Sequence, residues 1–165
     1  MSAAADSVSS FVFDMGIAVG SLDVVDETVS PGINYWEDQH FEQGFSWSPG
    51  NVSFGTITDA GIQRVEVRTA DEIELKPTAK RAIVVPFSVS SSSRIIVTNI
   101  YAIQMIDFVP AGSYALIFET GDDDELWCRL TFVRSETAEP AVLIADDELS
   151  LTTPLLMEAE PLNGR

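Results

Sequence analysis

The side chains that most often carry out covalent or acid–base chemistry are scarce in this chain. It contains one histidine, His40, and one cysteine, Cys128. A serine nucleophile needs a neighbouring base, and no Gly-x-Ser-x-Gly turn presents a serine in that way. His40 lies in an aromatic-rich segment, and we expect it to be a packed or surface histidine rather than a general base. We therefore predict no catalytic residue and expect that the protein is not an enzyme.

Metal and cofactor sites are not indicated either. One histidine and one cysteine far apart in sequence form no zinc-binding pattern. The acidic run Gly121–Glu125 lacks the ligand spacing of a calcium-binding EF-hand loop, and it is better interpreted as the tip of a hairpin. The chain also lacks the glycine-rich motifs that cradle nucleotide phosphates. We predict neither a metal nor a cofactor.

Carboxylates beside aromatic rings are the feature that could support binding. Surface carboxylates can occupy phosphate sites in a basic groove and speed association, while aromatic side chains act as desolvated anchors. The residues predicted to bind a partner are Trp36, Glu37, Asp38, Phe41, Glu42 and Trp47. The alternative is that the rings only cover one end of the fold and the acids only keep the protein in solution.

The same segment contains the helix that the sequence favours. Residues Trp36 to Gln43 are not β-branched, acids stand in the first turn, and Gly44 follows as a C-terminal stop. A turn at Ser30–Gly32 leads into it. The apolar members Trp36 and Phe41 do not form one narrow stripe with their neighbours. We therefore expect a short helix that lies flat and covers one end of a β-sandwich.

The remaining sequence consists of strand-length apolar runs separated by turns. Phe11–Val19 is predicted as the first strand, and 23–30 as a polar, irregular segment. Val52–Ile57 and Ile62–Thr69 are interpreted as a hairpin. Tyr114–Glu119 and Leu126–Val133 form the strongest hairpin signal. The other expected strands are Ala82–Val89, Arg94–Val109 as one bent strand or two, and the segments 141–145 and 154–157, for which looser packing is expected.

This pattern predicts an all-β fold. Roughly eight short strands with turns every ~8 to 12 residues are typical of an antiparallel sandwich or barrel. We predict an antiparallel β-sandwich with one short covering helix. A chain of 165 residues fits one domain, residues 1–165, with a core of about 8–134 and an acidic C-terminal extension of 135–165.

Charge restricts the partners. The chain has 26 acidic and 9 basic residues and a net charge of −17, which disfavours direct binding to nucleic acid or an anionic membrane and favours a basic partner. Cys128 cannot form an intramolecular disulfide, and residues 1–6 do not resemble a signal peptide. No run approaches the ~18 apolar residues of a membrane span. We expect a cytoplasmic protein and leave a homodimer open.

Three segments carry a resemblance to a known family. The first combines Trp36, Asp38, Phe41, Glu42, Gly44 and Phe45 with Gly50–Phe54; the others are Lys80–Val89 and Val109–Leu116. In this order and spacing they resemble the ComJ family, competence proteins that inhibit the DNA-entry nuclease NucA. The resemblance extends from about Phe11 to Val133 and leaves the acidic extension unexplained.

The resemblance implies a single ComJ-like domain whose partner is a basic nuclease of the NucA kind. Our hypothesis is a non-enzymatic, acidic inhibitor or immunity-type partner of a nuclease. The alternative is a β-sandwich module that binds a small molecule or carbohydrate and uses Trp36, Trp47 or Trp127 as a stacking platform.

Overall fold

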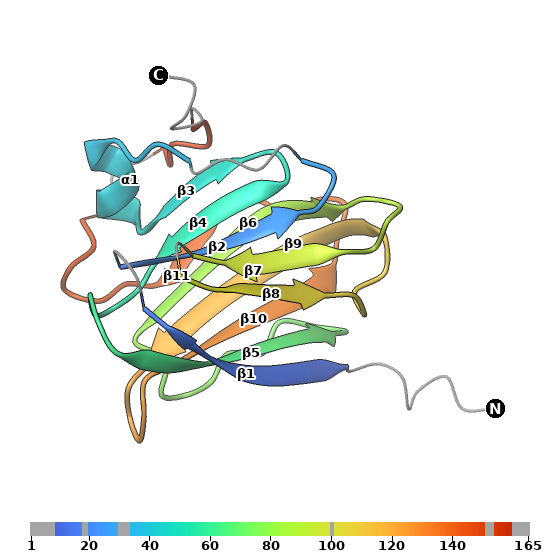
Figure 1. Ribbon diagram of the computed structural model, residues 1–165. Helices are drawn as coiled ribbons and strands as arrows, with labels where there is room; N and C mark the ends of the chain where they lie inside the picture. Colours follow the sequence, from blue (N-terminus) through green and yellow to red (C-terminus); the bar gives the residue numbers. More distant parts are fainter. Residues whose placement is uncertain (1–8, 18–19, 30–33, 100, 151–153, 160–165) are drawn as a thin grey trace.

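The protein consists of two β-sheets packed face to face, as the computed structural model shows (Figure 1). The structure describes residues 9–17, 20–29, 34–99, 101–150 and 154–159. The six-stranded sheet has the order β1-β5-β10-β9-β6-β11 and the five-stranded sheet the order β3-β4-β2-β7-β8. The larger sheet contains β1 (Ser10–Gly16), β5 (Ile62–Ala70), β6 (Arg81–Val89), β9 (Gly112–Gly121), β10 (Trp127–Arg134) and β11 (Ala141–Ile144). The smaller contains β2 (Ser21–Asp26), β3 (Phe45–Ser48), β4 (Asn51–Gly55), β7 (Ile95–Thr98) and β8 (Ile103–Ile106).

The core lies between the sheets and is apolar. Phe54 on β4 stacks on Phe118 on β9 with ring centroids 4.6 Å apart, so the two sheets are joined by parallel aromatic rings. Leu22 and Val24 on β2 are fully buried beneath them. Burying each such side chain contributes roughly 1.5–3 kcal/mol. The all-β sandwich prediction is confirmed.

The outer face of the six-stranded sheet is partly covered by the connection between β5 and β6. Glu119 on β9 is fully buried, and its carboxylate accepts hydrogen bonds from Arg129 Nε at 2.9 Å and from the backbone N–H of Lys76 at 2.6 Å. Arg129 also donates to the carbonyl of Glu74. This buried ion pair ties the charged connection to the sheet.

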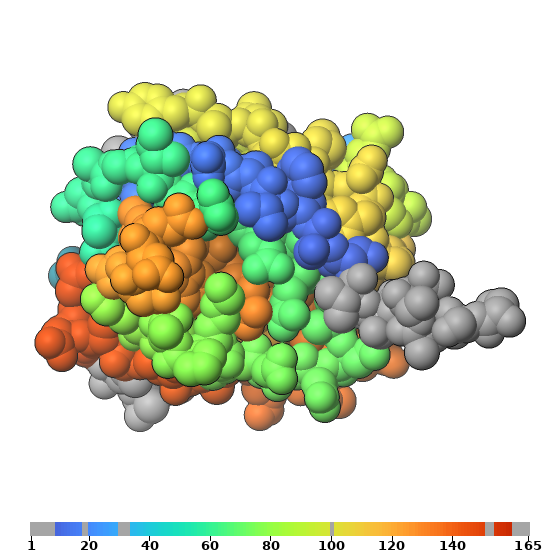
Figure 2. Space-filling view, turned by 90° about the horizontal axis from the view of Figure 1, so that it is seen from below, coloured from blue at the N-terminus to red at the C-terminus, as the bar shows by residue number. Residues whose placement is uncertain are grey.

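The β9–β10 hairpin is confirmed, with Gly121 opposite Trp127 at its closed end. Seen from below (Figure 2), its orange tip projects on the left, while β1, in blue, lies beside the green of β5. The run 94–109 contains two strands, β7 and β8, which pair antiparallel. Residues 154–157 form no strand.

Two strand predictions are wrong. The segments 52–57 and 62–69 are not a hairpin, because β4 belongs to the five-stranded sheet and β5 to the six-stranded one. The polar-looking segment from Asp23 is not irregular, because β2 lies centrally between β4 and β7. The sheets are also not wholly antiparallel, since β5 and β10 run parallel.

The described residues contain one helix, α1 (Asp38–Gln43), which lies beside β3 at the edge of the smaller sheet (Figure 1). It is shorter than predicted: Trp36 precedes it and Glu37 is the N-cap. Gly44 ends it with φ of 88°, as expected of a left-handed glycine stop. The segment 45–48, for which no strand was predicted, is strand β3. The predicted turn Ser30–Gly32, Ile33 and residues 18–19 lie outside the described residues.

Candidate functional site

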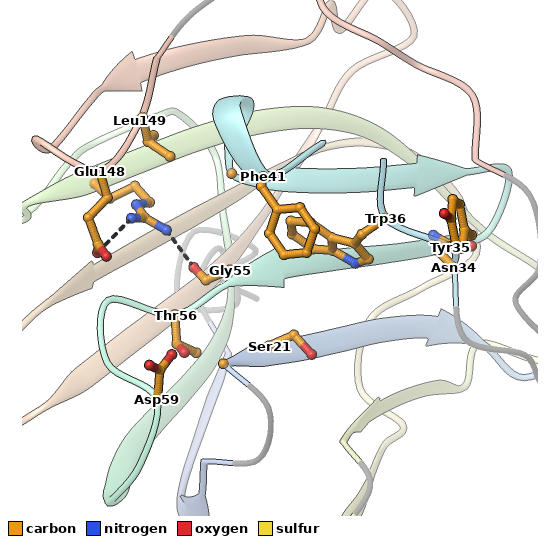
Figure 3. A pocket seen from close by; sticks show the side chains of 13 residues that line it. Ser21, Asn34, Tyr35, Trp36, Phe41, Gly55, Thr56, Asp59, Glu148 and Leu149 are labelled. Atoms are coloured by element: carbon orange, nitrogen blue, oxygen red, sulfur yellow. Dashed lines mark hydrogen bonds and ion pairs between the residues drawn. The ribbon is translucent and has the colours of Figure 1, made fainter. Parts of the chain in front are cut away.

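A hollow of about 520 Å³ opens beside α1 on the outer side of the five-stranded sheet (Figure 3). Residues from five parts of the chain meet there: the segment 34–36, α1 with Gly44, the start of β2, the residues that end and follow β4, and the start of β6. Residues 148 and 149 complete the lining. The hollow is therefore built by contacts between distant segments and not by one sequence motif.

One wall of the hollow is aromatic. The rings of Trp36 and Phe41 lie 5.0 Å apart at an interplanar angle of 46°. Phe41 is 63% exposed although it belongs to the helix, so its ring faces the opening and not the core. Trp36 Nε1 donates to Ser53 Oγ on β4 at 3.3 Å, which holds the indole against the sheet.

Ser53 also hydrogen-bonds to the buried carboxylate of Asp23 on β2, so Asp23, Ser53 and Trp36 form a hydrogen-bonded chain from the sheet to the wall. Burial raises the pKa of Asp23 above its ordinary value of 3.8, and the bond from Ser53 offsets this only in part. Oδ1 of Asp23 has no hydrogen-bond partner among the described residues. The support of the indole thus includes a carboxylate that is costly to ionise.

Arg81, the first residue of β6, lies deep in the hollow. Its guanidinium donates to the carbonyl of Gly55 at 2.9 Å and to both oxygens of Asp146 at 3.0 and 2.8 Å. Glu148 approaches the same group at 3.5 Å. The Arg81 side chain is 4% exposed and that of Glu148 is 69% exposed, so the cation is buried while one of its carboxylate partners faces solvent.

Three polar side chains of α1, of which His40 and Gln43 are buried, hold residues 154–158. Gln43 donates to the carbonyl of Leu156 and accepts from its N–H, both at 2.9 Å. Gln39 donates to the carbonyl of Pro154. His40 accepts from the N–H of Glu37 through Nδ1, so its Nε2 carries the proton and donates to the carbonyl of Glu158. The residues held at 154, 156 and 158 alternate, as in an extended segment, which we call the C-terminal strap (154–159).

The structure brings together two of the six residues predicted to bind a partner, Trp36 and Phe41. Glu37 and Asp38 are exposed at the start of α1, next to this wall. The carbonyl of Glu42 accepts the N–H of Ser150. Trp47 does not line the hollow: its indole donates to the carbonyl of Pro86 on the opposite sheet at 2.8 Å and packs against the core.

The expectation that His40 is a packed or surface histidine is met by the packed position. His40 is fully buried and packed. Cys128 is a buried free thiol in the core, and burial raises its pKa, so it behaves as a small apolar side chain. Trp127 is buried, donates to Asp123, and is covered by the Lys76 ammonium 4.6 Å from its ring centroid. It offers no open ring face for stacking.

The described part of the chain contains no group of three or more His, Cys, Asp or Glu residues placed to hold a metal ion. Within the same residues, no helix has the length and apolar character to cross a membrane. The site is therefore characterised by its hollow, its aromatic wall and its carboxylates.

Comparison with known families decides the relationship. The model of the competence protein J (ComJ) family matches residues 14–133. This chain belongs to the ComJ family. The crystal structure of ComJ from Bacillus subtilis, an inhibitor of the DNA degrading activity of NucA, matches with a TM-score of 0.69 at 20% identity, covering 78% of this chain and 98% of that chain.

A second solved structure, described as crocagin biosynthetic gene J, matches with a TM-score of 0.51 at 13% identity, covering 78% of this chain and 97% of that chain. At these identities both structures show a shared fold. No curated protein matches the sequence.

Several residues of the hollow were missed by sequence reasoning. Asp146 and Glu148 lie beyond the range matched to the ComJ family, yet they pair with Arg81 inside it. Asp59, in the loop after β4, also lines the hollow. The only sequence signal was Arg81 itself, a charge at the start of an apolar strand, and it does not reveal a partner 65 residues away.

Proposed function

We propose that this protein is a non-enzymatic inhibitor that binds a basic nuclease. The observation that carries the proposal is its membership of the ComJ family over residues 14–133, which is accompanied by structural likeness to an inhibitor of NucA. The burial of His40 and Cys128 supports it indirectly, because histidine and cysteine often act in catalysis and here both side chains lie in packed surroundings.

The net charge of −17 supports a basic partner. Clustered carboxylates attract a positively charged protein at long range and raise the rate of association. In this chain exposed acids flank the aromatic wall: Glu37 and Asp38 at the start of α1, and Glu148 and Asp59 at the hollow. A nuclease that presents a basic DNA-binding groove has the complementary charge.

We place the contact surface on the α1 side of the five-stranded sheet. It comprises Trp36, Phe41 and the acids Glu37, Asp38 and Glu42, all of which are exposed or half-buried. Interface hot spots combine a central aromatic anchor with a polar rim. Phe41 is 63% exposed and has carboxylates around it, so it has the properties of such an anchor. We leave Trp47 out of the contact, because its indole is fixed to Pro86.

The test is a DNA-degradation assay in which purified protein is titrated into a NucA-type nuclease at low salt. We expect the DNA-degrading activity to reach its minimum near one molar equivalent of inhibitor. An unrelated pancreatic-type DNase is the control, and it should stay active, because the acidic protein does not shield the DNA. Full nuclease activity at a large excess of inhibitor would exclude the proposal.

The hollow supports a second candidate, the binding of a small molecule or carbohydrate. Its volume of about 520 Å³ and its aromatic wall are of the kind seen in ligand pockets. A ligand that stacks on Trp36 should change the tryptophan fluorescence of the parent protein and not of Trp36→Phe. A panel of sugars and amino-acid derivatives that changes neither would count against this candidate.

A further inference from the structure

We infer that the hollow beside α1 is a socket for one cationic side chain, an arginine or lysine, of the partner protein. The inference rests on the proposed inhibitor function, and it adds the chemistry that the partner must present. It is carried by the charge balance of the hollow, by its aromatic wall and by the buried position of Arg81.

The charge balance leaves the hollow negative. The guanidinium of Arg81 pairs with Asp146 and Glu148, and Asp59 lines the same hollow, so these three carboxylates outnumber the one cation by two negative charges. Asp59 forms no ion pair with any described residue. The side chain of Glu148 is 69% exposed and reaches Arg81 only at 3.5 Å, so it can also face an incoming cation. A positive group entering the opening would meet both.

The aromatic wall also favours a cationic side chain. In Figure 3 the rings of Trp36 and Phe41 lie together, and Glu148 and Asp59 lie apart from them on the other side of the view. Cations bind to the faces of aromatic rings, most strongly to tryptophan, and arginine does so more often than lysine. A planar guanidinium can stack on a ring while its N–H groups reach a carboxylate.

An anionic ligand fits the hollow less well than a cationic one, although the hollow contains the guanidinium of Arg81. Nη1 of Arg81 is bonded to the carbonyl of Gly55, and Nη2 to Asp146. Nε of Arg81 has no hydrogen-bond partner among the described residues, but it is buried. An anion would therefore reach the guanidinium only by disturbing the buried pair with Asp146, and it would then face Glu148 and Asp59. Arg81 is therefore better understood as the group that holds the acidic residues in place.

The acidic side of the socket comes partly from outside the matched family range. Glu148 and Leu149 line the hollow, and both follow residue 133, where the match to the ComJ family ends. The buried pair between Arg81 and Asp146 brings them there. The acidic C-terminal extension thus supplies a recognition group to a site whose other walls belong to the matched part of the chain.

The test uses two probes of nearly equal shape, N-acetyl-arginine amide and its neutral citrulline counterpart, in an NMR titration of the full chain. The indole signal of Trp36 should move with the arginine probe, while those of Trp47 and Trp127, which do not line the hollow, should stay in place. We expect the arginine probe to bind at least about fivefold more tightly than citrulline, because only the cation gains from the ring faces and carboxylates.

The variant Asp59→Asn/Glu148→Gln should weaken arginine binding by about threefold or more, because two unneutralised charges are removed. Glu136→Gln/Glu139→Gln is the matched control. It removes two exposed acids that follow the C-terminal end of β10 and do not line the hollow, so it should leave binding unchanged. Equal affinity for the two probes, no movement of the Trp36 signal, or equal effects of the two variants would overturn the socket.

A nuclease assay with the same variants separates this inference from the proposed function. If the parent inhibits the nuclease but the arginine probe does not bind, the socket is wrong and the inhibitor function stands. If the probe binds as expected but no NucA-type nuclease is inhibited, the inhibitor function is wrong and the cation preference of the hollow stands.

Discussion

Nη2 of Arg81 lies 3.0 Å from Oδ1 and 2.8 Å from Oδ2 of Asp146, so one buried nitrogen holds both oxygens of a carboxylate 65 residues away. This pair fixes the segment after β11 to the first residue of β6. It therefore couples the stability of the C-terminal part of the chain to the shape of the hollow.

Removing the charge of Asp146 should destabilise the protein. In Asp146→Asn the buried guanidinium of Arg81 faces a neutral amide in place of the carboxylate, and the exposed Glu148 is its only remaining anionic partner. Breaking a buried ion pair costs roughly 3 kcal/mol. Glu125→Gln is the matched control, because Glu125 pairs with Arg64 in an exposed position, where a pair contributes about 1 kcal/mol or less. Chemical denaturation measures both, and equal losses would contradict the role of the buried pair.

Two aspartates of β2 should respond to substitution with opposite signs. Because burial raises the pKa of Asp23, its ionised form is less stable in the folded protein than in the unfolded chain. Asp23→Asn should therefore raise the free energy of unfolding at pH 7 by about 1 kcal/mol. The gain should shrink as pH falls through the raised pKa and vanish below 3.8, the ordinary value at which the unfolded carboxyl is also protonated.

Asp26 is the contrasting residue. Burial raises its pKa, but hydrogen bonds from Thr28 and Ser90 outweigh that effect, and the net pKa is lowered. Its ionised form therefore stabilises the fold above the ordinary value of 3.8, and this stabilisation is lost as pH falls through the lowered pKa. Asp26→Asn should cost about 1 kcal/mol at pH 7. Thermal melts across this pH range would contradict the assignment if both variants changed in the same direction.

The C-terminal strap should loosen when Gln43 is truncated. Its fully buried amide makes three hydrogen bonds, two to Leu156 and one to the carbonyl of Phe45. Gln43→Ala would leave backbone groups without partners and cost about 2 kcal/mol. Hydrogen exchange at Leu156 should rise strongly. Gln39→Ala, which loses one exposed bond to Pro154, should change it little; a strap equally protected in both variants would contradict this.

Phe41 should matter for inhibition and little for stability. It is 63% exposed, so Phe41→Ala should cost less than about 1 kcal/mol of folding free energy. If Phe41 anchors the interface, the same change should weaken nuclease binding by at least about tenfold. Ile103→Ala is the control, a 74% exposed apolar residue on β8, the opposite edge strand of the sheet. Equal inhibition constants for the two variants would exclude the anchor.

Local signals in the sequence predicted local structure correctly. The β9–β10 hairpin follows from two apolar runs around an acidic turn, and the end of α1 follows from Gly44. The error at β4 and β5 has a physical cause: alternation shows that a segment is a strand, but not which of two sheets it joins. β2 was missed because Asp23 and Asp26 look like loop residues, although both are buried.

The candidate site was predictable only in part. The aromatic and acidic residues around α1 stood together in the sequence, and two of them line the hollow. The rest of the site depends on contacts between distant segments, such as Arg81 with Asp146 and Trp36 with Ser53. Nothing in the spacing of these residues indicates that they meet. The role of Trp47 was also hidden, because its hydrogen bond crosses to the other sheet.

The central claim, that this acidic protein inhibits a basic nuclease through the α1 side of the smaller sheet, is tested most directly by the association rate constant with a NucA-type nuclease at increasing salt. The Debye length shrinks from about 30 Å at 0.01 M to about 8 Å at 0.15 M salt, so the rate should fall by about tenfold or more. Glu37→Gln/Asp38→Asn should lower the low-salt rate, and Glu136→Gln/Glu139→Gln should lower it less. A rate that does not depend on salt, or equal rates for the two variants, would contradict the account.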